Sequence, residues 1–126
     1  MRPFQELIVW QKAHQLVLDV YGISHAFPRE EQFGLTSQMR RSAASVPTNI
    51  AEGSVHDEGR EFHRFLGIAL GSAAELEYQL ILARDLGYLT AVDHEPLDKA
   101  VNDVKRMLVR FRTRLRTTTR PPVASS

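Results

Sequence analysis

The feature that most constrains this chain is a helical repeat of apolar residues that continues for almost thirty positions. Across residues 58–86, apolar side chains recur at spacings of three and four, which places them on one face of an α-helix. A helix of this length is about 40 Å long at about 1.5 Å per residue, so it predicts an elongated fold. Gly87 follows the last apolar position and is the expected C-terminal stop. The apolar positions are Phe62, Phe65 or Leu66, Ala69, Ala73, Leu76, Leu80 and Ala83.

Three further segments show the same spacing. The first, residues 7–26, ends at Phe27-Pro28 because proline disfavours the helical conformation in the residue before it. The second, residues 37–54, has Thr36 as its expected N-cap. The fourth begins behind Asp93, with Pro96 in its first turn. The predicted inward faces are Trp10, Ala13, Val17, Val20, Ser24 and Phe27 in the first segment, Met39, Ser42 or Ala43, Val46, Ile50 and Gly53 in the second, and Leu97, Val101, Val104, Leu108, Phe111 and Leu115 in the fourth.

These segments predict an all-α fold, an up-down-up-down antiparallel four-helix bundle, because four amphipathic helices are joined by three short connections. Pro47 lies inside the second helix and lacks the N–H that a helix interior needs. The apolar pattern continues in phase beyond Pro47, so we expect a kink there and not a break. We expect one domain over residues 1–118 and a disordered tail over residues 119–126.

Composition limits the class of protein. The chain has 126 residues, of which 43% are hydrophobic and 25% are charged, as is typical of globular proteins. It has no cysteine, which excludes disulfides and thiolate chemistry and suits a reducing compartment such as the cytoplasm. The N-terminal residues show no signal-peptide core, and we expect no membrane span.

Charge is distributed unevenly. Residues 1–98 hold 8 Lys/Arg and 14 Asp/Glu, a net charge of −6, whereas residues 99–126 hold 8 Lys/Arg and only Asp103, a net charge of +7. At 100° per residue, four cations of the fourth helix line up on the side opposite its apolar face. Such a row suits a phosphate backbone, but it also fits solubility and favourable cations near a helix C-terminus. The four cations are Lys99, Arg106, Arg110 and Arg114.

A polar stripe runs beside the apolar face of the second helix. Its spacing fits either a solvated face with weak ion pairs or polar contacts within the bundle or across a subunit interface. We expect an ion pair between Arg41 and Glu75 under the second interpretation. The residues of the stripe are Gln38, Arg41, Ser45, Asn49 and Glu52, and Arg64, Gly71, Glu75 and Gln79 are similarly aligned on the third helix. Ser72, beside Gly71, is a further candidate interface residue.

The glycines at 67 and 71 form a Gly-x-x-x-Gly pattern in the third helix. Glycine inside a helix costs about 1 kcal/mol relative to alanine, so we expect compensation by close packing within or between subunits.

Motifs of catalysis and metal binding are missing from the sequence. The di-iron pattern Glu-x-x-His is absent, as are the nucleophile elbow and the glycine-rich phosphate loops. We therefore expect no enzyme, no metal, no cofactor and no small-molecule substrate. A hydrolase or metalloprotein built on Glu52, His56 and His63 is the least supported alternative.

Four distinctive motifs occur in order along the chain. They are residues 7–13 (LIVWQKA), residues 27–28 with 33–43 (FP, FGLTSQMRRSA), residues 45–53 (SVPTNIAEG) and the spaced pattern F-x-x-F-L-x-I-A-x-G-S-x-x-E-L-E over residues 62–77. Together they resemble the bacterial 23S ribosomal RNA intervening-sequence protein family. The turn at residues 55–59 (VHDEG) departs from the resemblance, because a more basic turn is expected there.

The resemblance implies a ring-shaped homopentamer of four-helix bundles without known catalytic activity. Relatives serve as accessory subunits of retroelements, in contact with a reverse transcriptase and nucleic acid. We therefore expect a homo-oligomeric scaffold whose partner is structured RNA or an RNA-bound protein. The alternative is a purely structural assembly whose acidic and basic surfaces pair between subunits.

Overall fold

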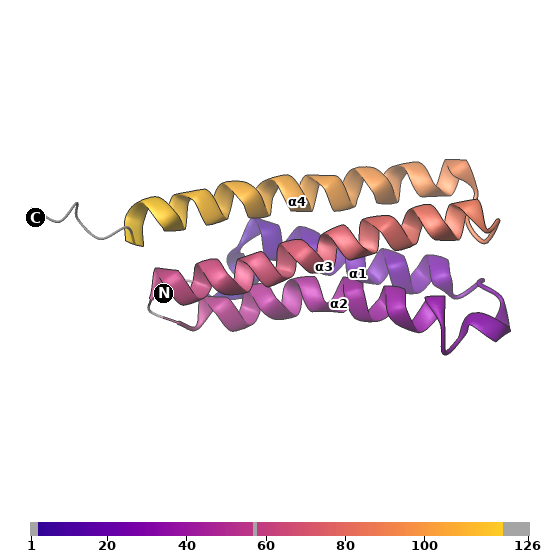
Figure 1. Cartoon of the computed structure of the whole chain (residues 1–126), viewed down its shortest axis with the longest axis horizontal. Helices are drawn as coiled ribbons and strands as arrows, with labels where there is room; N and C mark the ends of the chain where they lie inside the picture. The colour runs from indigo at the N-terminus through magenta and orange to yellow at the C-terminus, as the bar shows by residue number, and fades with distance from the viewer. Residues whose placement is uncertain (1–2, 57, 120–126) are drawn as a thin grey trace, which may run out of the picture.

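The protein is a bundle of four long helices. The computed structural model describes residues 3–56 and 58–119, and no strand occurs in these residues. The connections between successive helices lie at alternate ends of the elongated molecule (Figure 1). Helix α1 packs against α2 and α4, and α3 packs against α2 and α4, which closes a ring of four neighbours. The predicted all-α four-helix fold is confirmed. The helices are α1 (Ile8–Ser24), α2 (Leu35–Ser54), α3 (Gly59–Asp85) and α4 (Ala91–Thr119), with short 3₁₀ helices η1 (Phe4–Glu6) and η2 (Arg29–Glu31).

The core follows the faces predicted for α2, α3 and α4, although Phe62, Phe111 and Leu115 are only partly buried, and α1 requires one correction. Val9 and Leu16 are buried in α1, whereas Trp10 and Val17 are only partly buried. Trp10 packs instead against Phe4 of η1, with ring centroids 5.1 Å apart. The largest fully buried side chains are Leu16, Met39, Ile50, Leu66, Leu76, Leu80, Leu108, Val20, Val46, Val101 and Val104.

Both predicted N-caps are wrong, because each helix begins earlier than its pattern suggested. Helix α2 begins at Leu35, and the carboxylate of Glu31 accepts the Leu35 N–H at 3.1 Å, so Thr36 lies within the helix. Helix α4 begins at Ala91, and the Thr90 hydroxyl oxygen accepts the Asp93 N–H at 3.1 Å. A carboxylate or hydroxyl that caps a helix satisfies one of the four N–H groups left unpaired in its first turn.

The predicted stop after α3 is confirmed. Gly87 has a φ of +83°, and its N–H donates to the carbonyl of Arg84 at 3.0 Å. The N–H of Tyr88 donates to the carbonyl of Ala83 at 2.9 Å, which completes a Schellman motif.

Helix α2 continues through Pro47, which is buried, and the kink at this position remains a prediction. Thr119 is the last residue of α4, and the rest of the tail predicted over residues 119–126 lies outside the described residues.

By length and composition alone, α3 is apolar enough to cross a membrane, and the absence of a membrane span remains a prediction. Its apolar residues have another role here, because seven residues of α3 are buried. In addition, Glu77 near its middle binds Lys105 and Asn102 of α4. The packing of α3 in the core of the bundle accounts for the apolar residues on its buried face.

Candidate nucleic-acid interface

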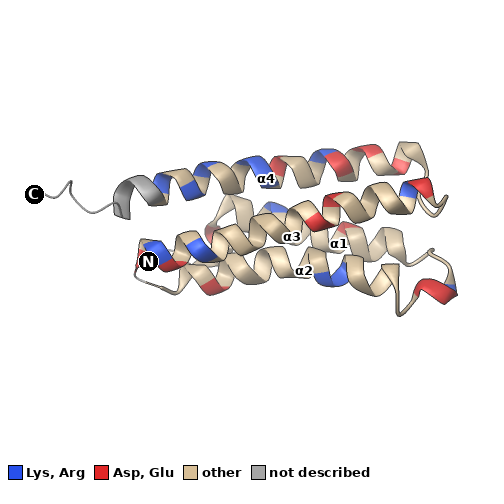
Figure 2. Ribbon diagram, in the orientation of Figure 1, with Lys and Arg blue, Asp and Glu red and all other residues tan. Residues whose placement is uncertain are grey.

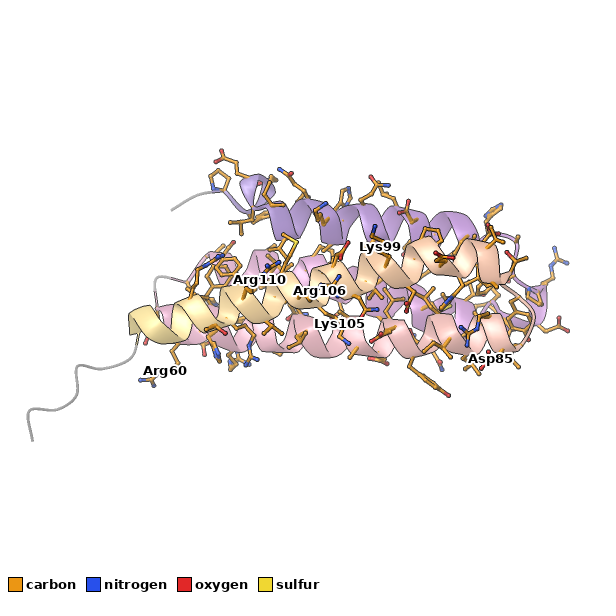
Figure 3. The ribbon with its side chains drawn as sticks, turned by 90° about the horizontal axis from the view of Figure 1, so that it is seen from above. Arg60, Asp85, Lys99, Lys105, Arg106 and Arg110 are labelled. Atoms are coloured by element: carbon orange, nitrogen blue, oxygen red, sulfur yellow. The ribbon has the colours of Figure 1, made fainter. Side chains whose placement is uncertain are left out.

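All four cations predicted to form a row on α4 are exposed, and they lie along its outer side. Figure 3 shows Lys99, Arg106 and Arg110 in succession along the helix. Residues four apart on a helix are separated by about 6 Å along its axis, so the row spans about 22 Å. Asp103 interrupts the row and forms an ion pair with Arg106. The carboxylate lowers the positive potential in the middle of the row and leaves the strongest part toward Arg110.

Arg110 and Arg114 border a shallow groove between α4 and the start of α1. The groove has a volume of about 600 Å³, and Glu6, Leu7, Met107 and Phe111 are also part of its lining. The guanidinium of Arg114 lies over the ring of Phe111, 5.4 Å from its centroid, which is the geometry of a cation–π contact.

The beginning of α3 adds cations that the sequence pattern did not assign to the row. Lys and Arg of α4 and of the first turns of α3 gather at the same end of the bundle (Figure 2). On α3 they are Arg60 and Arg64, and Arg112 of α4 reaches across to donate to the carbonyl of His63 at 3.3 Å. Because α3 and α4 pack side by side, the start of α3 meets the end of α4.

Glu61 neutralises part of this basic end. Arg64 donates to both oxygens of Glu61, at 3.0 and 3.2 Å, and this hydrogen bonding lowers the pKa of the Glu61 carboxyl. Among residues 3–56 and 58–119, no carboxylate forms an ion pair with Arg60, Arg110 or Arg112 at this end.

Lys105 does not belong to the solvated row. Its ammonium lies 2.6 Å from the carboxylate of Glu77 on α3, and both side chains are about one quarter exposed. Asn102 donates to the second oxygen of Glu77 at 2.9 Å. The hydrogen bonds from Lys105 and then from Asn102 lower the pKa of the Glu77 carboxyl. This cluster fixes the register of α3 against α4.

We expect Glu77→Gln to lower the free energy of unfolding by about 1 kcal/mol at pH 7, because hydrogen bonds to a charged group are lost. The folded pKa is lowered, so the contribution is complete above the unfolded pKa of about 4.3 and is lost as the pH falls through the folded pKa. The difference between wild type and variant should therefore shrink in acid, as measured by urea unfolding from pH 7 to pH 3. Glu95→Gln, at an exposed position of α4, is the control. A difference that stays constant with pH would contradict the assignment.

The polar stripe of α2 divides into a contact and a solvated part. The hydroxyls of Ser45 and Ser72 are 2.7 Å apart and join α2 to α3, and the Asn49 amide donates to Ser45. Gln38, Glu52 and Glu75 are exposed. The contact between helices is made by Ser45 and Ser72, and Asn49 supports Ser45 within α2. A role of the stripe in a subunit interface remains a prediction.

The predicted pair of Arg41 with Glu75 is wrong within the chain. Among the described residues Arg41 has no carboxylate partner, and it donates to the Ser37 hydroxyl of its own helix at 3.3 Å. Both Arg41 and Glu75 are exposed, so water satisfies these charges at little cost.

The two glycines of the Gly-x-x-x-Gly pattern differ. A methyl group at Gly67 would lie 3.0 Å from a terminal nitrogen of Arg112, so this glycine makes room for the guanidinium. Gly71 has nothing within 4 Å of that position and lies on the exposed side of α3. The close approach at Gly67 therefore comes from a side chain of α4, and close packing at Gly71 remains a prediction for the assembly.

The histidines of the third alternative have structural contacts. His56 stacks on Phe65, with ring centroids 5.4 Å apart, and the carbonyl of His63 accepts from Arg112. Within residues 3–56 and 58–119, no group of three His, Cys, Asp or Glu is placed to hold a metal ion.

The fold and the surface define a small all-α protein, a four-helix bundle with one basic end. More particularly, the chain belongs to the 23S rRNA-intervening sequence protein family, whose model matches residues 5–110. The structure is also similar to a crystal structure from Bacteroides thetaiotaomicron, a protein of unknown function from the S23 ribosomal protein family. The two chains are 24% identical with a TM-score of 0.74, over 82% of this chain and 96% of the other, which shows the shared fold. No protein with curated function matches.

Proposed function

We propose that this protein is a non-enzymatic, homo-oligomeric scaffold of the cytoplasm that binds structured RNA through its basic end. The observation that carries the proposal is the gathering of exposed cations from α3 and α4 at one end of the bundle (Figure 2). Clustered arginines on one face attract phosphates and release counterions when they bind. The cysteine-free composition supports a reducing compartment.

The basic end favours binding to the backbone over recognition of bases. The nearest aromatic residue of α4, Phe111, is partly buried, and its ring meets that of Phe62 at a centroid distance of 5.0 Å. Arg114 covers the same ring. A ring held in this way offers no free face on which a base can stack. We therefore expect the affinity for RNA to depend strongly on salt concentration and little on the RNA sequence.

We expect the fourfold Ala variant of Lys99, Arg106, Arg110 and Arg114 to bind a structured RNA at least tenfold more weakly at low salt. Loss of phosphate contacts should also flatten the slope of log affinity against log salt, by up to about one unit per contact. Fluorescence anisotropy at 50 and 200 mM salt measures both quantities. The matched control removes four exposed cations elsewhere, in Lys12, Arg29, Arg41 and Arg84.

Light scattering of each sample records the mass of the oligomer. An unchanged affinity in the α4 variant, or an equal loss in the control, would contradict the proposed surface. An intact oligomer of the wild type that binds no RNA would direct the search to protein partners, including an RNA-bound protein. An oligomer that dissociates in high salt would instead favour a structural assembly held by acidic and basic surfaces.

A further inference from the structure

The outer side of α1 carries a second row of residues with helical spacing, distinct from the row that faces the core. Helix α1 lies along one edge of the molecule (indigo in Figure 3) and packs against η1, α2 and α4. Every residue of the outer row is exposed, and the spacings alternate between three and four, as at the a and d positions of a coiled coil. The row is thus a helix face that no other described element covers. Its residues are Ile8, Gln11, Gln15, Leu18, Gly22 and His25.

Large apolar side chains of this face are open to solvent. Ile8 and Leu18 of the row are 56% and 51% exposed, and Tyr21 beside the row is 46% exposed. A Cβ atom at Gly22 would have no neighbour within 4 Å, so another helix can approach the backbone of α1 closely there. Covering these side chains removes apolar surface from water, which favours association with a partner helix.

The charges of α1 indicate what the partner is. Of the 17 residues of α1, only Lys12 and Asp19 are Lys, Arg, Asp or Glu, whereas α4 has eleven such residues among its 29. Both flank the row on the same side, and they are seven residues apart, about 10 Å along the axis, which is too far to pair within one helix. Among residues 3–56 and 58–119, no carboxylate forms an ion pair with Lys12. Asp19 accepts a hydrogen bond from the amide of Gln15 at 3.0 Å, through one of its two oxygens.

A second copy of α1 in the antiparallel direction complements both charges. A two-fold axis near the middle of α1 would place Lys12 beside Asp19 of the partner subunit, and Asp19 beside the partner subunit's Lys12. The same axis would place Leu18 of the row beside Gln15 of the partner subunit. A parallel copy would set equal residues at the same level and leave the opposite charges about 10 Å apart along the axis.

We propose that the outer row of α1 is a contact between two copies of this chain, which pair in antiparallel fashion through Leu18 and the ion pairs of Lys12 with Asp19. The row and its flanking residues involve about ten side chains of each copy, fewer than the 20–30 of a standard interface, so we expect a dissociation constant of about 10–100 μM. The contact specifies a surface for the homo-oligomer and rests on that part of the proposed function. It does not use the cations of α3 and α4.

Sedimentation equilibrium of the full chain, from about 1 to 300 μM at low salt, tests the contact. Lys12→Asp and Asp19→Lys should each weaken the association about tenfold, because like charges then face each other across the axis. An equimolar mixture of these two variants should associate as the wild type does, since their charges are opposite. Leu18→Glu should halve the mass found at the highest concentration. All three positions are exposed, so the chain should fold normally.

Two substitutions outside the row are the matched controls. Arg29→Asp reverses an exposed charge of η2, and Phe33→Glu replaces an apolar side chain that is 91% exposed. Neither should change the mass at any concentration, because neither residue lies on α1.

The outcomes separate this contact from the proposed function. Variants of α1 that keep the mass of the wild type, a mixture that fails to restore association, or an equal loss in the controls would overturn the α1 contact and leave the homo-oligomer to another face. A wild type that stays monomeric up to 300 μM would overturn both the contact and the homo-oligomeric part of the proposed function. Anisotropy of a short RNA hairpin with Leu18→Glu should give the affinity of the wild type, so RNA binding is tested independently of the contact.

Discussion

We expect Gly53→Ala to lower the free energy of unfolding by about 3 kcal/mol, the upper part of the range for overpacking a close contact. The new methyl group would lie 2.7 Å from Cδ1 of Phe62 and 2.8 Å from Cβ of Phe65. The Cβ of Phe65 is fixed to the backbone of α3 and cannot rotate away. The ring of Phe62 is held edge-on against Phe111. The two helices must therefore separate locally to admit one methyl group.

The same substitution at two other glycines provides matched controls. At Gly71, nothing lies within 4 Å of the new methyl group, so the helix propensity of alanine should raise stability by about 0.5–1 kcal/mol. At Gly67, the contact is the end of a flexible Arg112 side chain, so the gain in propensity and the displaced guanidinium should nearly cancel. The expected order of stability is thus Gly71→Ala, then Gly67→Ala, then Gly53→Ala.

Urea unfolding monitored by circular dichroism measures all three variants. Equal effects at Gly53 and Gly71 would contradict the packing of α2 against α3. The measurement should be made at two protein concentrations, because a loss at Gly71 that depends on concentration would place the exposed face of α3 in a subunit interface.

Periodicity predicted most of the core of α2, α3 and α4, and in α2 and α4 the reason is a single clear apolar face. Residues 35–54 and 91–115 alternate that face with polar residues, so the buried positions follow from spacing alone. Helix α1 is apolar on more than one side, with Ile8, Val9 and Trp10 in succession. Spacing could not distinguish Val9 from Trp10, and the partner that decides between them, Phe4, belongs to a separate short helix.

Contacts between distant residues were the part that sequence reasoning missed. Glu31 contacts Tyr88, which lies 57 positions away, and Glu77 of α3 contacts Lys105 of α4. Such pairs depend on the rotation of each helix about its axis, which a local pattern does not specify. Arg41 is the opposite case. Its expected partner, Glu75, lies on the neighbouring helix α3, but its side chain donates to Ser37, one turn away on its own helix.

The row on α4 could be predicted because its four cations lie on one helix. The addition of Arg60 and Arg64 to this basic surface could not be predicted, because it requires that the start of α3 lies beside the end of α4. Once antiparallel neighbours are expected, charged residues near opposite ends of consecutive helices are the signal to examine.

We expect Leu76→Ala to lower the free energy of unfolding by about 3–4 kcal/mol. Leu76 is fully buried on α3, in the core that all four helices share. Truncating a buried leucine removes its transfer free energy and leaves a cavity, which together cost about 2–5 kcal/mol. Leu18→Ala is the matched control, because Leu18 is 51% exposed on α1 and should change stability by no more than about 0.5 kcal/mol.

The Leu76 variant also separates stability from binding. At a temperature where Leu76→Ala is still folded, the exposed charges of α4 are unchanged, so the affinity for RNA and its salt slope should equal those of the wild type. The fourfold α4 variant should show the reverse, a weakened affinity with a nearly unchanged midpoint of thermal unfolding, because its cations are exposed. A folded Leu76→Ala protein that binds RNA more weakly would contradict a rigid surface fixed by α3 and α4, and would indicate that RNA binds through a rearranged bundle.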